Sequence, residues 1–437
     1  MSFENVALFP ETAQVNNRGH LELGGCDVVE LCREFGTPLY VFDESTLRSA
    51  CRRFRRAFGD AYPDSLVLYA SKAFLNRAIA RLVMEEGLGL DVVSGGELAV
   101  ARVVEFPPKL IYFHGNNKSP QELEEGLDYR IGRFAVDSLH EIELLGELAR
   151  KRGVVQEVIL RVSPNVDPHT HAHTTTGVLD SKFGFPLETG QADEAVRLIG
   201  RTAGLRLVGL HFHLGSPIFE LEPYATAIDR VLEWAADLGD ALELREFSPG
   251  GGFAIGYVRE EPPPPVEEYA AVIADALKKA VARHGLPSPR LLVEPGRAIV
   301  GPAGVALYTV GAIKDIPGVR KYVSVDGGMG DNIRPALYGS RYEAVVANRM
   351  WDERDRERVT LAGKYCESGD VLIRDIDLPE LRPGDVVAVP GSGAYAPSMA
   401  SNYNLNPRPA IVMVREGQAR LIRRRETYQD LMALDEV

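Results

Sequence analysis

The sequence is poor in cysteine, and its cysteines are not spaced for chemistry. Only four occur in 437 residues. They are Cys26, Cys32, Cys51 and Cys366, and no pair has the C-x-x-C spacing of a zinc or redox site. A chain of this length can form a sizeable core, which rules out a disulfide-stapled miniprotein. We expect reduced thiols, three of them packing residues.

Long hydrophobic runs and an excess of positive charge are also missing. No run of about 18 apolar residues is present, which argues against a transmembrane helix. The opening MSFENVALFPET lacks the basic and apolar regions of a secretory signal, which predicts a cytoplasmic protein. Lysine and arginine total 49 against 62 acidic residues, a net charge of −13, which is the wrong sign for binding phosphate backbones. We expect neither membrane nor nucleic acid as a partner.

A regular alternation of strands and helices is present instead. Eight short apolar, β-branched-rich runs cover residues 66–70, 88–93, 110–113, 133–136, 157–162, 207–212, 244–247 and 290–293. Segments with a helical period lie between them, at 76–86, 96–104, 138–151, 189–199, 223–238 and 266–284. Alternation predicts a parallel sheet, and eight repeats in about 250 residues indicate a closed (β/α)8 TIM-type barrel. A doubly wound open sheet is the alternative, although its G-x-G-x-x-G turn is missing.

The pattern changes beyond about residue 300. Short alternating strands with Gly, Pro and Asp turns replace the helical period, as at residues 322–326, 371–374 and 386–390. We therefore predict an N-terminal segment 1–40 that joins a β domain, a barrel over 41–300, and a C-terminal β-rich domain over 301–437.

Polar residues with chemical potential follow the predicted strands. Catalytic groups of barrel enzymes collect at the carboxyl ends of the strands. The residues at these positions are Lys72, Asp91, His114, Asp137, Arg161, His213, Gly250–Gly252 and Glu294. A single lysine after a strand is usually a solvated surface cation, but this one belongs to a set. The set predicts a catalytic site at this end of the barrel.

Two local patterns within this set suggest particular ligands. Gly250–Gly252 offers unobstructed backbone N–H groups, which suit a phosphate. His211 and His213 share a strand face, so a metal pair, and with it a metal-dependent barrel hydrolase, is an alternative to a histidine stacked on a cofactor ring. His169, His171 and His173 alternate in a loop-like stretch, where solvated roles are favoured over zinc.

Several motifs occur together in an order that resembles a known family. They are Tyr69-Ala-Ser-Lys72, Ser181-Lys-Phe-Gly184, His211-Phe-His-Leu-Gly-Ser216, Gly250–Gly252, Glu294-Pro-Gly-Arg297, Ile333-Arg-Pro-Ala-Leu-Tyr338, Cys366-Glu-Ser-Gly-Asp370, Gly393-Ala-Tyr395 and Ser401-Asn-Tyr-Asn404. Over nearly the full length the chain resembles the diaminopimelate decarboxylase family, within the pyridoxal-phosphate (PLP) decarboxylases of the alanine-racemase-like barrel class.

The resemblance implies roles for particular residues of these motifs, and it implies that no metal is bound. It implies that Lys72 binds PLP covalently, that His213 stacks on the ring, and that Glu294 contacts the pyridine nitrogen. Asp91 is implied to contact the cofactor as well. The residues implied to bind the phosphate are Ser216, Gly251, Gly252, Gly296 and Arg297. It implies substrate contacts for Arg297, Arg334, Tyr338 and Tyr395, the last touching the cofactor as well. Cys366 and Glu367 are implied to enter the site from the partner subunit of a homodimer.

The chemistry of these residue types favours one reaction. A carboxylate beside the ring nitrogen favours its protonated form, which stabilises the electron pair left by a departing CO₂ and suits decarboxylation better than racemisation. Cys366 is a candidate acid, and Glu367 can meet a second amino group on the substrate. The resemblance implies decarboxylation of meso-2,6-diaminopimelate to L-lysine, the last step of lysine biosynthesis. The alternatives are a PLP decarboxylase of another basic amino acid or a carboxylated polyamine, and a non-catalytic homologue.

Overall fold

The computed structural model describes residues 6–167, 177, 179–351 and 356–436. The chain divides into two compact units. The barrel unit comprises Cys51–Ala254 and Pro263–Gly296, and the β unit comprises Met1–Ala50, Ile255–Pro262 and Arg297–Val437. His169, His171 and His173 lie outside the described residues.

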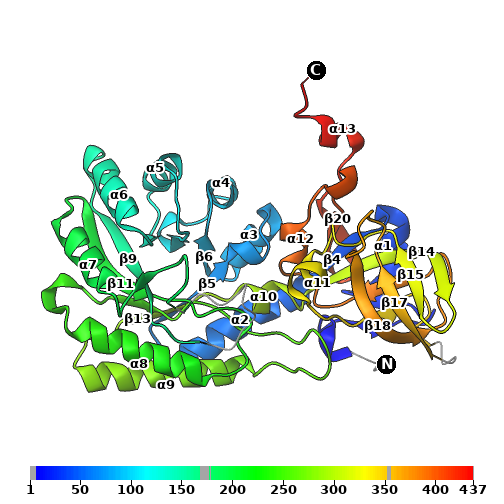
Figure 1. Ribbon diagram of the computed structural model, residues 1–437, viewed down its shortest axis with the longest axis horizontal. Coiled ribbons are helices and arrows are strands. Elements are labelled where there is room, and N and C mark those ends of the chain that lie inside the picture. Colours follow the sequence, from blue (N-terminus) through cyan, green and yellow to red (C-terminus); the bar gives the residue numbers. More distant parts are fainter. Residues whose placement is uncertain (1–5, 168–176, 178, 352–355, 437) are drawn as a thin grey trace. The chain divides into compact units, whose positions relative to one another are not determined.

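The barrel unit is built on a closed ring of parallel strands (Figure 1). The strands are β5 (Ser65–Ala70), β6 (Gly89–Val92), β7 (Ile111–Phe113), β8 (Arg133–Val136), β9 (Gln156–Ser163), β11 (Leu205–His211), β12 (Glu246–Ser248) and β13 (Arg290–Val293). Strand β13 pairs with β5 and so closes the ring, while the short β10 (Phe185–Pro186) pairs with β9 outside it. The predicted barrel and its eight strands are confirmed, and the closure excludes the open sheet.

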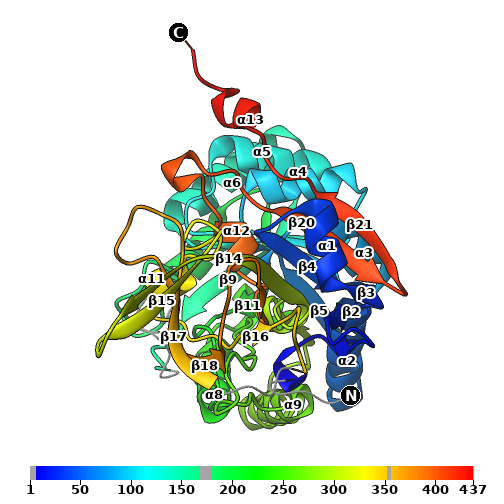
Figure 2. The same cartoon turned by 90° about the vertical axis from the view of Figure 1, so that its right-hand side faces the viewer.

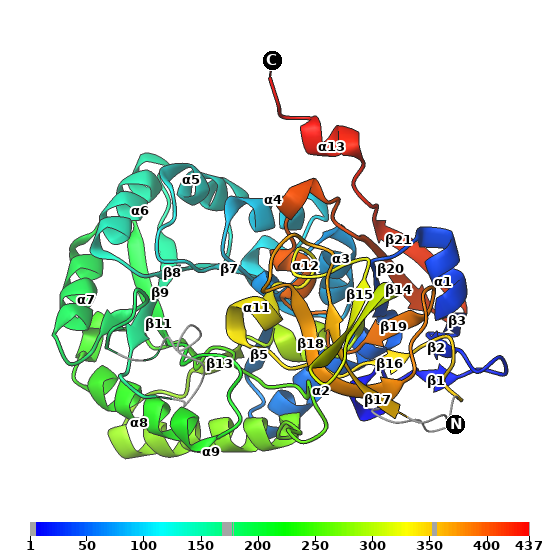
Figure 3. The same cartoon turned by 45° about the vertical axis from the view of Figure 1, so that its right-hand side comes forward.

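Helices follow the strands and lie outside the ring (Figure 3). They are α3 (Arg77–Glu85), α4 (Gly95–Val103), α5 (Pro120–Tyr129), α6 (Leu139–Lys151), α7 (Gln191–Arg201), α8 (Glu222–Ala236) and α9 (Val266–His284), and α2 (Glu44–Ala61) precedes β5. Side-chain caps start several of them: Ser94 caps α4, Ser119 caps α5 in a capping box, and Ser138 caps α6. These caps end the strand-to-helix loops sharply, close to the strand ends where the site lies.

The inside of the barrel is filled by side chains. A buried cluster of Leu68, Tyr112, Ala135, Ile159, Val208 and Leu292 brings together residues from six strands of the ring. Such a layer of inward-pointing side chains makes the interior a packed core without a channel. The polar groups at either end of the strands are therefore separated by this apolar layer.

The β unit is a mixed sheet in the order β18-β17-β15-β14-β4-β20-β21 (Figure 2). Its strands are β4 (Leu39–Asp43), β14 (Gly304–Ile316), β15 (Arg320–Val325), β17 (Arg356–Ala362), β18 (Val371–Pro379), β20 (Ala410–Arg415) and β21 (Gln418–Arg423), with β19 (Val386–Val389) pairing β14 and β16 (Val345–Val346). The N-terminal residues add β1 (Gln14–Val15), β2 (Leu21–Leu23), β3 (Cys26–Asp27) and α1 (Val28–Phe35). Short helices α10 (Arg297–Val300), α11 (Arg334–Tyr338), α12 (Ala396–Met399) and α13 (Tyr428–Met432) complete the unit.

The bounds of the two units differ from the predicted domains 1–40, 41–300 and 301–437. Strand β4 crosses the predicted boundary at residue 40, and it pairs antiparallel with β14 and parallel with β20. Its buried residues Leu39 and Val41 join the core of the β unit. Residues Ile255–Pro262 also belong to this unit although they lie within the predicted barrel range. Backbone pairing and burial therefore assign these segments to the β unit. The alternation of strands and helices along the sequence does not reveal this assignment.

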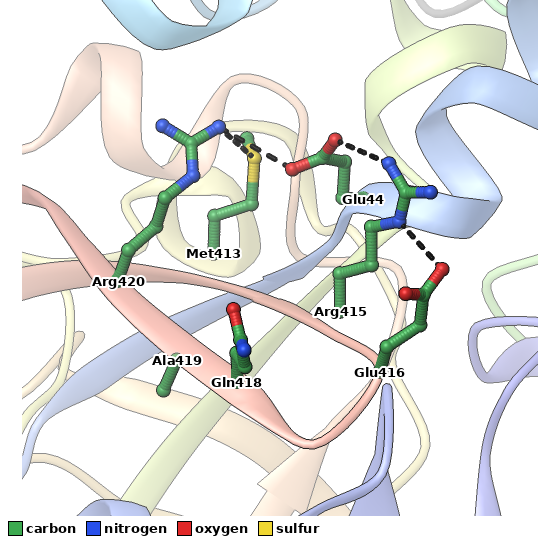
Figure 4. A pocket seen from close by; sticks show the side chains of 7 residues that line it. All are labelled: Glu44, Met413, Arg415, Glu416, Gln418, Ala419 and Arg420. Atoms are coloured by element: carbon green, nitrogen blue, oxygen red, sulfur yellow. Dashed lines mark hydrogen bonds and ion pairs between the residues drawn. The ribbon is translucent and has the colours of Figure 1, made fainter.

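A surface pocket of the β unit is lined partly by ion-paired side chains (Figure 4). It is lined by Glu44, Met413, Arg415, Glu416, Gln418, Ala419 and Arg420. Glu44 lies 3.3 Å from both Arg415 and Arg420, so its carboxylate joins the start of α2 to the β20–β21 hairpin. This geometry serves the attachment of the hairpin. Separately, none of the described helices is both long and apolar enough to cross a bilayer.

Candidate active site

The register of the barrel strands brings six polar residues to their carboxyl ends. His211 pairs with Arg161 of β9 on one side and with Ser248 of β12 on the other, so these three side chains lie at one level. Asp91 of β6 pairs with Ala70, two residues before Lys72. His114 and Glu294 follow β7 and β13 directly. Adjacent residues of a parallel sheet point the same way, so the register alone predicts a shared cluster.

Lys72 is the exposed member of this region. It lies in a 3-10 turn, Ser71–Ala73, whose other two residues are buried. Its ammonium acts electrostatically on Asp91, Glu97 and His213. Lys118 differs, because its Nζ is buried and donates to the backbone oxygens of Gly115 and Ala135 and to Glu141. Lys72 is therefore accessible to a carbonyl compound, whereas Lys118 is occupied.

Glu294 is held by direct hydrogen bonds on both carboxylate oxygens. Ser248 donates its hydroxyl to Oε1 at 2.7 Å, and His211 Nε2 lies 3.0 Å from Oε2. Burial alone would raise the pKa of Glu294, but the hydrogen bonds from His211 and Ser248 to its two oxygens hold it well below its ordinary value. The result is a buried carboxylate that stays ionised.

Two further groups complete the cluster around Glu294. His114 Nε2 lies 3.7 Å from Glu294 and 3.9 Å from Asp91. Burial lowers the pKa of His114 well below its ordinary value, so this imidazole is neutral. Burial and the neighbouring Glu294 carboxylate raise the pKa of Asp91 well above its ordinary value, against the opposing effect of Lys72. The cluster therefore contains one stable anion, Glu294, and one carboxyl group, Asp91, that keeps its proton to a higher pH than an ordinary aspartate.

His211 and His213, which the sequence offered as a possible metal pair, do not belong to one group in the structure. His114, His211 and Glu294 offer ligand atoms within 4.8 Å of one another, a spacing a metal ion could use. His213 is not in this group, since its Nδ1 accepts a hydrogen bond from the Gly251 N–H at 3.2 Å. Burial lowers the pKa of His213 well below its ordinary value. A neutral imidazole is suited to stacking on a flat ring, and the stacking of His213 on the cofactor stays a prediction.

The glycine turn after β12 tolerates no side chain. A Cβ on Gly251 would lie 2.3 Å from the Glu294 carbonyl oxygen, and one on Gly252, at φ +107°, 2.6 Å from that of Gly215. A Cβ on Gly296 would lie 2.9 Å from the Ala70 carbonyl oxygen. Only glycine therefore fits these positions beside the strand ends. Ser216 lies in the loop after β11 and is half-buried.

The barrel residues fit a PLP group. Buried polar atoms of Ser71, Asp91, His114 and His211 have no hydrogen-bond partner among the described residues. Unsatisfied buried polar atoms are costly, and they gather here around an ionised carboxylate, an accessible lysine and a glycine turn. These are the groups needed by a ring with a basic nitrogen, an aldehyde and a phosphate. The contacts of Lys72, Asp91, His213, Ser216, Gly251, Gly252, Glu294 and Gly296 with the cofactor remain predictions.

A second polar cluster lies within the β unit. Arg297 Nη1 is 2.6 Å from the Tyr257 hydroxyl, and its guanidinium stacks over the Tyr395 ring at 4.7 Å. Arg334 stacks over the Tyr257 ring at 4.6 Å and donates to the Tyr342 hydroxyl at 2.5 Å. Burial would raise the pKa of Tyr257, but the two guanidinium groups lower it. Aromatic rings thus hold two buried arginines, which suits recognition of carboxylates.

The remaining predicted residues lie in the same unit. Tyr338 ends the short helix α11 that Arg334 begins. Cys366 is exposed, and its backbone N–H donates to Asn404 at 3.0 Å. Glu367 is also exposed and accepts a hydrogen bond from the Gly369 N–H at 3.3 Å. Substrate contacts by Arg297, Arg334, Tyr338, Tyr395 and Glu367 remain predictions.

Sequence reasoning missed four residues of these clusters. Glu97 stands three residues after Ser94, a spacing typical of a capping box, yet its Oε2 accepts the Val93 N–H at 2.7 Å. Burial raises the pKa of Glu97 to about 7. Ser248 directly precedes Pro249 and the glycine turn, so its strand-end position was a usable signal. Tyr257 and Tyr342 had no signal, because only the packing in the β unit brings them to the arginines.

The fold and the barrel cluster define a PLP-dependent barrel enzyme, and comparison with known proteins agrees. Residues 44–301 match the family of pyridoxal-dependent decarboxylases, in its pyridoxal-binding domain. The chain is 47% identical to diaminopimelate decarboxylase of Bacillus subtilis strain 168, over 97% of both chains. It superposes with a TM-score of 0.91 on the crystal structure of diaminopimelate decarboxylase from M. jannaschii in complex with L-lysine, at 36% identity and with 98% of both chains covered.

The chain therefore belongs to the diaminopimelate decarboxylase family of pyridoxal-dependent decarboxylases. Its cofactor is PLP, as the sequence predicted.

Proposed function

We propose that this protein is a carboxy-lyase that decarboxylates meso-2,6-diaminopimelate to L-lysine and CO₂ in the cytoplasm, as the last step of lysine biosynthesis. The main support is the near full-length identity to diaminopimelate decarboxylases of 44–47%. The ionised Glu294 among His211, His114 and Ser248 supports the chemistry independently. A relative with another basic amino acid as substrate would share the fold but not this level of identity.

The barrel residues bind the cofactor and set its charge. PLP, when bound, supplies an electron sink for the pair left by the departing CO₂. Lys72 would hold the cofactor covalently through its side-chain amine, which the amino group of the substrate can replace. Glu294 keeps a proton on the ring nitrogen, because an anion next to that nitrogen favours its cationic form. The neutral His213 covers the ring, and Ser216 with the glycines at 251, 252 and 296 binds the phosphate.

The arginines orient the substrate. Arg297 and Arg334 are kept in place by Tyr257, whose ring and hydroxyl contact both guanidinium groups. Bidentate contacts from such guanidinium groups fix a carboxylate in one plane. Holding the substrate carboxylates in this way, with Tyr338 and Tyr395, directs the bond that breaks.

Residues 366 and 367 finish the reaction and select the substrate. Cys366 delivers the proton that replaces CO₂, and Glu367 pairs with the distal ammonium of the substrate. We propose that both come from the partner subunit of a homodimer. Cys366 is exposed, and Tyr403 and Leu405 near its Asn404 contact are exposed apolar side chains, 40% and 70% accessible, which suits an interface.

One assay tests the reaction. Purified protein with PLP is given meso-diaminopimelate, lysine, ornithine and a carboxylated polyamine in turn, while CO₂ and the product amine are measured. We expect turnover of meso-diaminopimelate to L-lysine to exceed all others. Faster turnover of lysine or ornithine would overturn the proposed substrate.

Subunit mixing tests the shared site. Lys72→Ala and Cys366→Ala proteins should each be inactive, and statistical exchange should restore about a quarter of the wild-type activity, because half of the dimers then carry one intact site. Exchange is verified with differently tagged subunits. Complete exchange without recovered activity would exclude a site shared between subunits.

Glu367→Gln tests the choice of substrate. Glutamine retains the oxygen that accepts the Gly369 N–H but loses the charge. We expect kcat/KM for meso-diaminopimelate to fall about 10- to 150-fold, with PLP affinity unchanged. If Glu367 only supports the turn, glutamine keeps the acceptor of the Gly369 N–H, and both kcat/KM and the preference for meso-diaminopimelate over lysine stay the same.

A further inference from the structure

His211 is tied to Glu294 by the geometry of a single ring nitrogen. Its Nε2 lies 3.0 Å from Glu294 Oε2, and its Nδ1 is buried with no hydrogen-bond partner among the described residues. The side chains of His211 and Glu294 are only 1% and 6% exposed. Water therefore does not compete for this contact.

These contacts select one protonation state of His211. A carboxylate accepts hydrogen bonds, so the proton must be on Nε2. A second proton on Nδ1 would be a buried donor without an acceptor, which is unfavourable. The neutral Nε2–H form is therefore favoured, and it holds Glu294 without cancelling its negative charge.

The other groups around Glu294 leave that role to His211. Ser248 is bonded to the other oxygen, and its Oγ also accepts the Gly250 N–H at 3.1 Å. His114 lies 3.7 Å from Glu294, beyond hydrogen-bond distance, and meets the His211 ring edge to face with centroids 4.7 Å apart. Arg161 on β9 and Asp91 on β6 interact electrostatically with Glu294.

We propose that His211 is a positioning residue that, as its neutral Nε2–H form, orients Glu294 and reserves its charge for the ring nitrogen of the cofactor. This rests on the proposed role of Glu294. An imidazolium at this place would satisfy the carboxylate by itself and weaken its effect on the ring. A missing donor would let the carboxylate rotate away. His211 thus influences the protonation of the ring nitrogen through Glu294, without contacting the cofactor itself.

Two amide variants separate this role from general packing. Glutamine at 211 can place its Nε2 donor where imidazole Nε2 lies, whereas asparagine reaches only as far as Nδ1. The readouts are the ¹⁵N shift of [¹⁵N]PLP in the holoenzyme and the affinity for PLP relative to its 1-deaza analogue, which lacks the ring nitrogen. His211→Gln should keep the protonated shift and the preference for PLP. In His211→Asn, the ¹⁵N shift should become that of an unprotonated ring nitrogen. The preference for PLP over its 1-deaza analogue should fall about 10- to 100-fold.

A structural role alone gives a different result. PLP and 1-deaza-PLP would then lose affinity in parallel in His211→Asn, with an unchanged ¹⁵N shift, and the proposal would be overturned. If His211→Asn fails to fold, wild-type holoenzyme labelled with [¹⁵N]histidine decides. His211 must show a protonated Nε2 and an unprotonated Nδ1, and an imidazolium or the other tautomer contradicts the proposal. These measurements use no substrate, so failure of the diaminopimelate assay is a separate result.

Discussion

Both ends of the barrel contain charged side chains, but the two ends differ in how completely these side chains are paired. At the amino ends of the strands, Arg133 makes a two-pronged ion pair with Glu246 at 2.9 Å and another with Glu157 at 2.7 Å. Tyr112 donates to Glu246 at 3.0 Å, and Arg245 bonds to Glu157. Nearly every charge here has a direct partner of opposite sign.

At the carboxyl ends, by contrast, polar atoms of Asp91, His114 and His211 have no hydrogen-bond partner in the described chain. Glu294 is held there by neutral donors, and Lys72 is accessible. Partnered charges contribute to stability, whereas unpartnered ones keep their capacity to bind something else. The comparison teaches that pairing, and not the mere presence of charge, separates the structural end from the functional end.

The largest effect should come from Lys72 at the carboxyl end. Lys72→Ala should lower kcat by about a thousandfold or more and abolish the borohydride-reducible PLP adduct, because the covalent attachment is lost. The unfolding free energy should not fall. The measurements are turnover, mass spectrometry after reduction, and denaturant unfolding.

Lys118 supplies the matched control for Lys72. Lys118→Met should keep the reducible adduct and lower stability, since it leaves Glu141 buried without its partner. An adduct that persists in Lys72→Ala would reassign the attachment site.

At the amino end, Glu246→Ala should act on stability alone. Removing one partner of a largely buried pair costs about 3 kcal/mol, because Arg133 keeps its charge. Denaturant unfolding measures this loss, and Tyr112→Phe should cost only about 1 kcal/mol. A fall in kcat/KM for folded Glu246→Ala would show that the two ends are coupled.

Glu97 should give the carboxyl end a distinctive pH response. Its folded pKa is about 7, above the ordinary value of about 4.3 in an unfolded chain. Between these values the native state binds more protons, so stability falls as the pH rises. Cofactor-free Glu97→Gln should gain about 2 kcal/mol over wild type on going from pH 5 to pH 8. Equal pH slopes for the two proteins would contradict this.

Glu157 at the amino end should respond with the opposite sign and the smallest size. Burial would raise its pKa, but Arg245, Arg133 and Arg206 lower it. Its contribution is therefore present above the unfolded pKa and is lost as the pH falls through the folded one. The advantage of wild type over Glu157→Gln should be about 1 kcal/mol at pH 7 and vanish on acidification. Persistence of the advantage in acid would point to packing.

Much of the fold and part of the site could be predicted from local pattern. Apolar runs of strand length located all eight strands of the ring, because a buried parallel strand must be apolar throughout. Strand-end position then singled out Lys72, Asp91, His114, Arg161 and Glu294, since parallel strands end at one rim. Strand β4 was divided at residue 40, because its partners β14 and β20 are hundreds of positions away in sequence.

The sequence by itself determined the alternation, the barrel and the family, because periodicity and motif order are local properties of the chain. The tertiary structure alone decided that His211 pairs with Glu294 and not with His213, and that Tyr257 joins Arg297 and Arg334. It also decided which charges are paired at one rim and which buried polar atoms of the described residues lack a hydrogen-bond partner at the other. These outcomes depend on register and on the side chains that exclude water, and neither is encoded in any single stretch of residues.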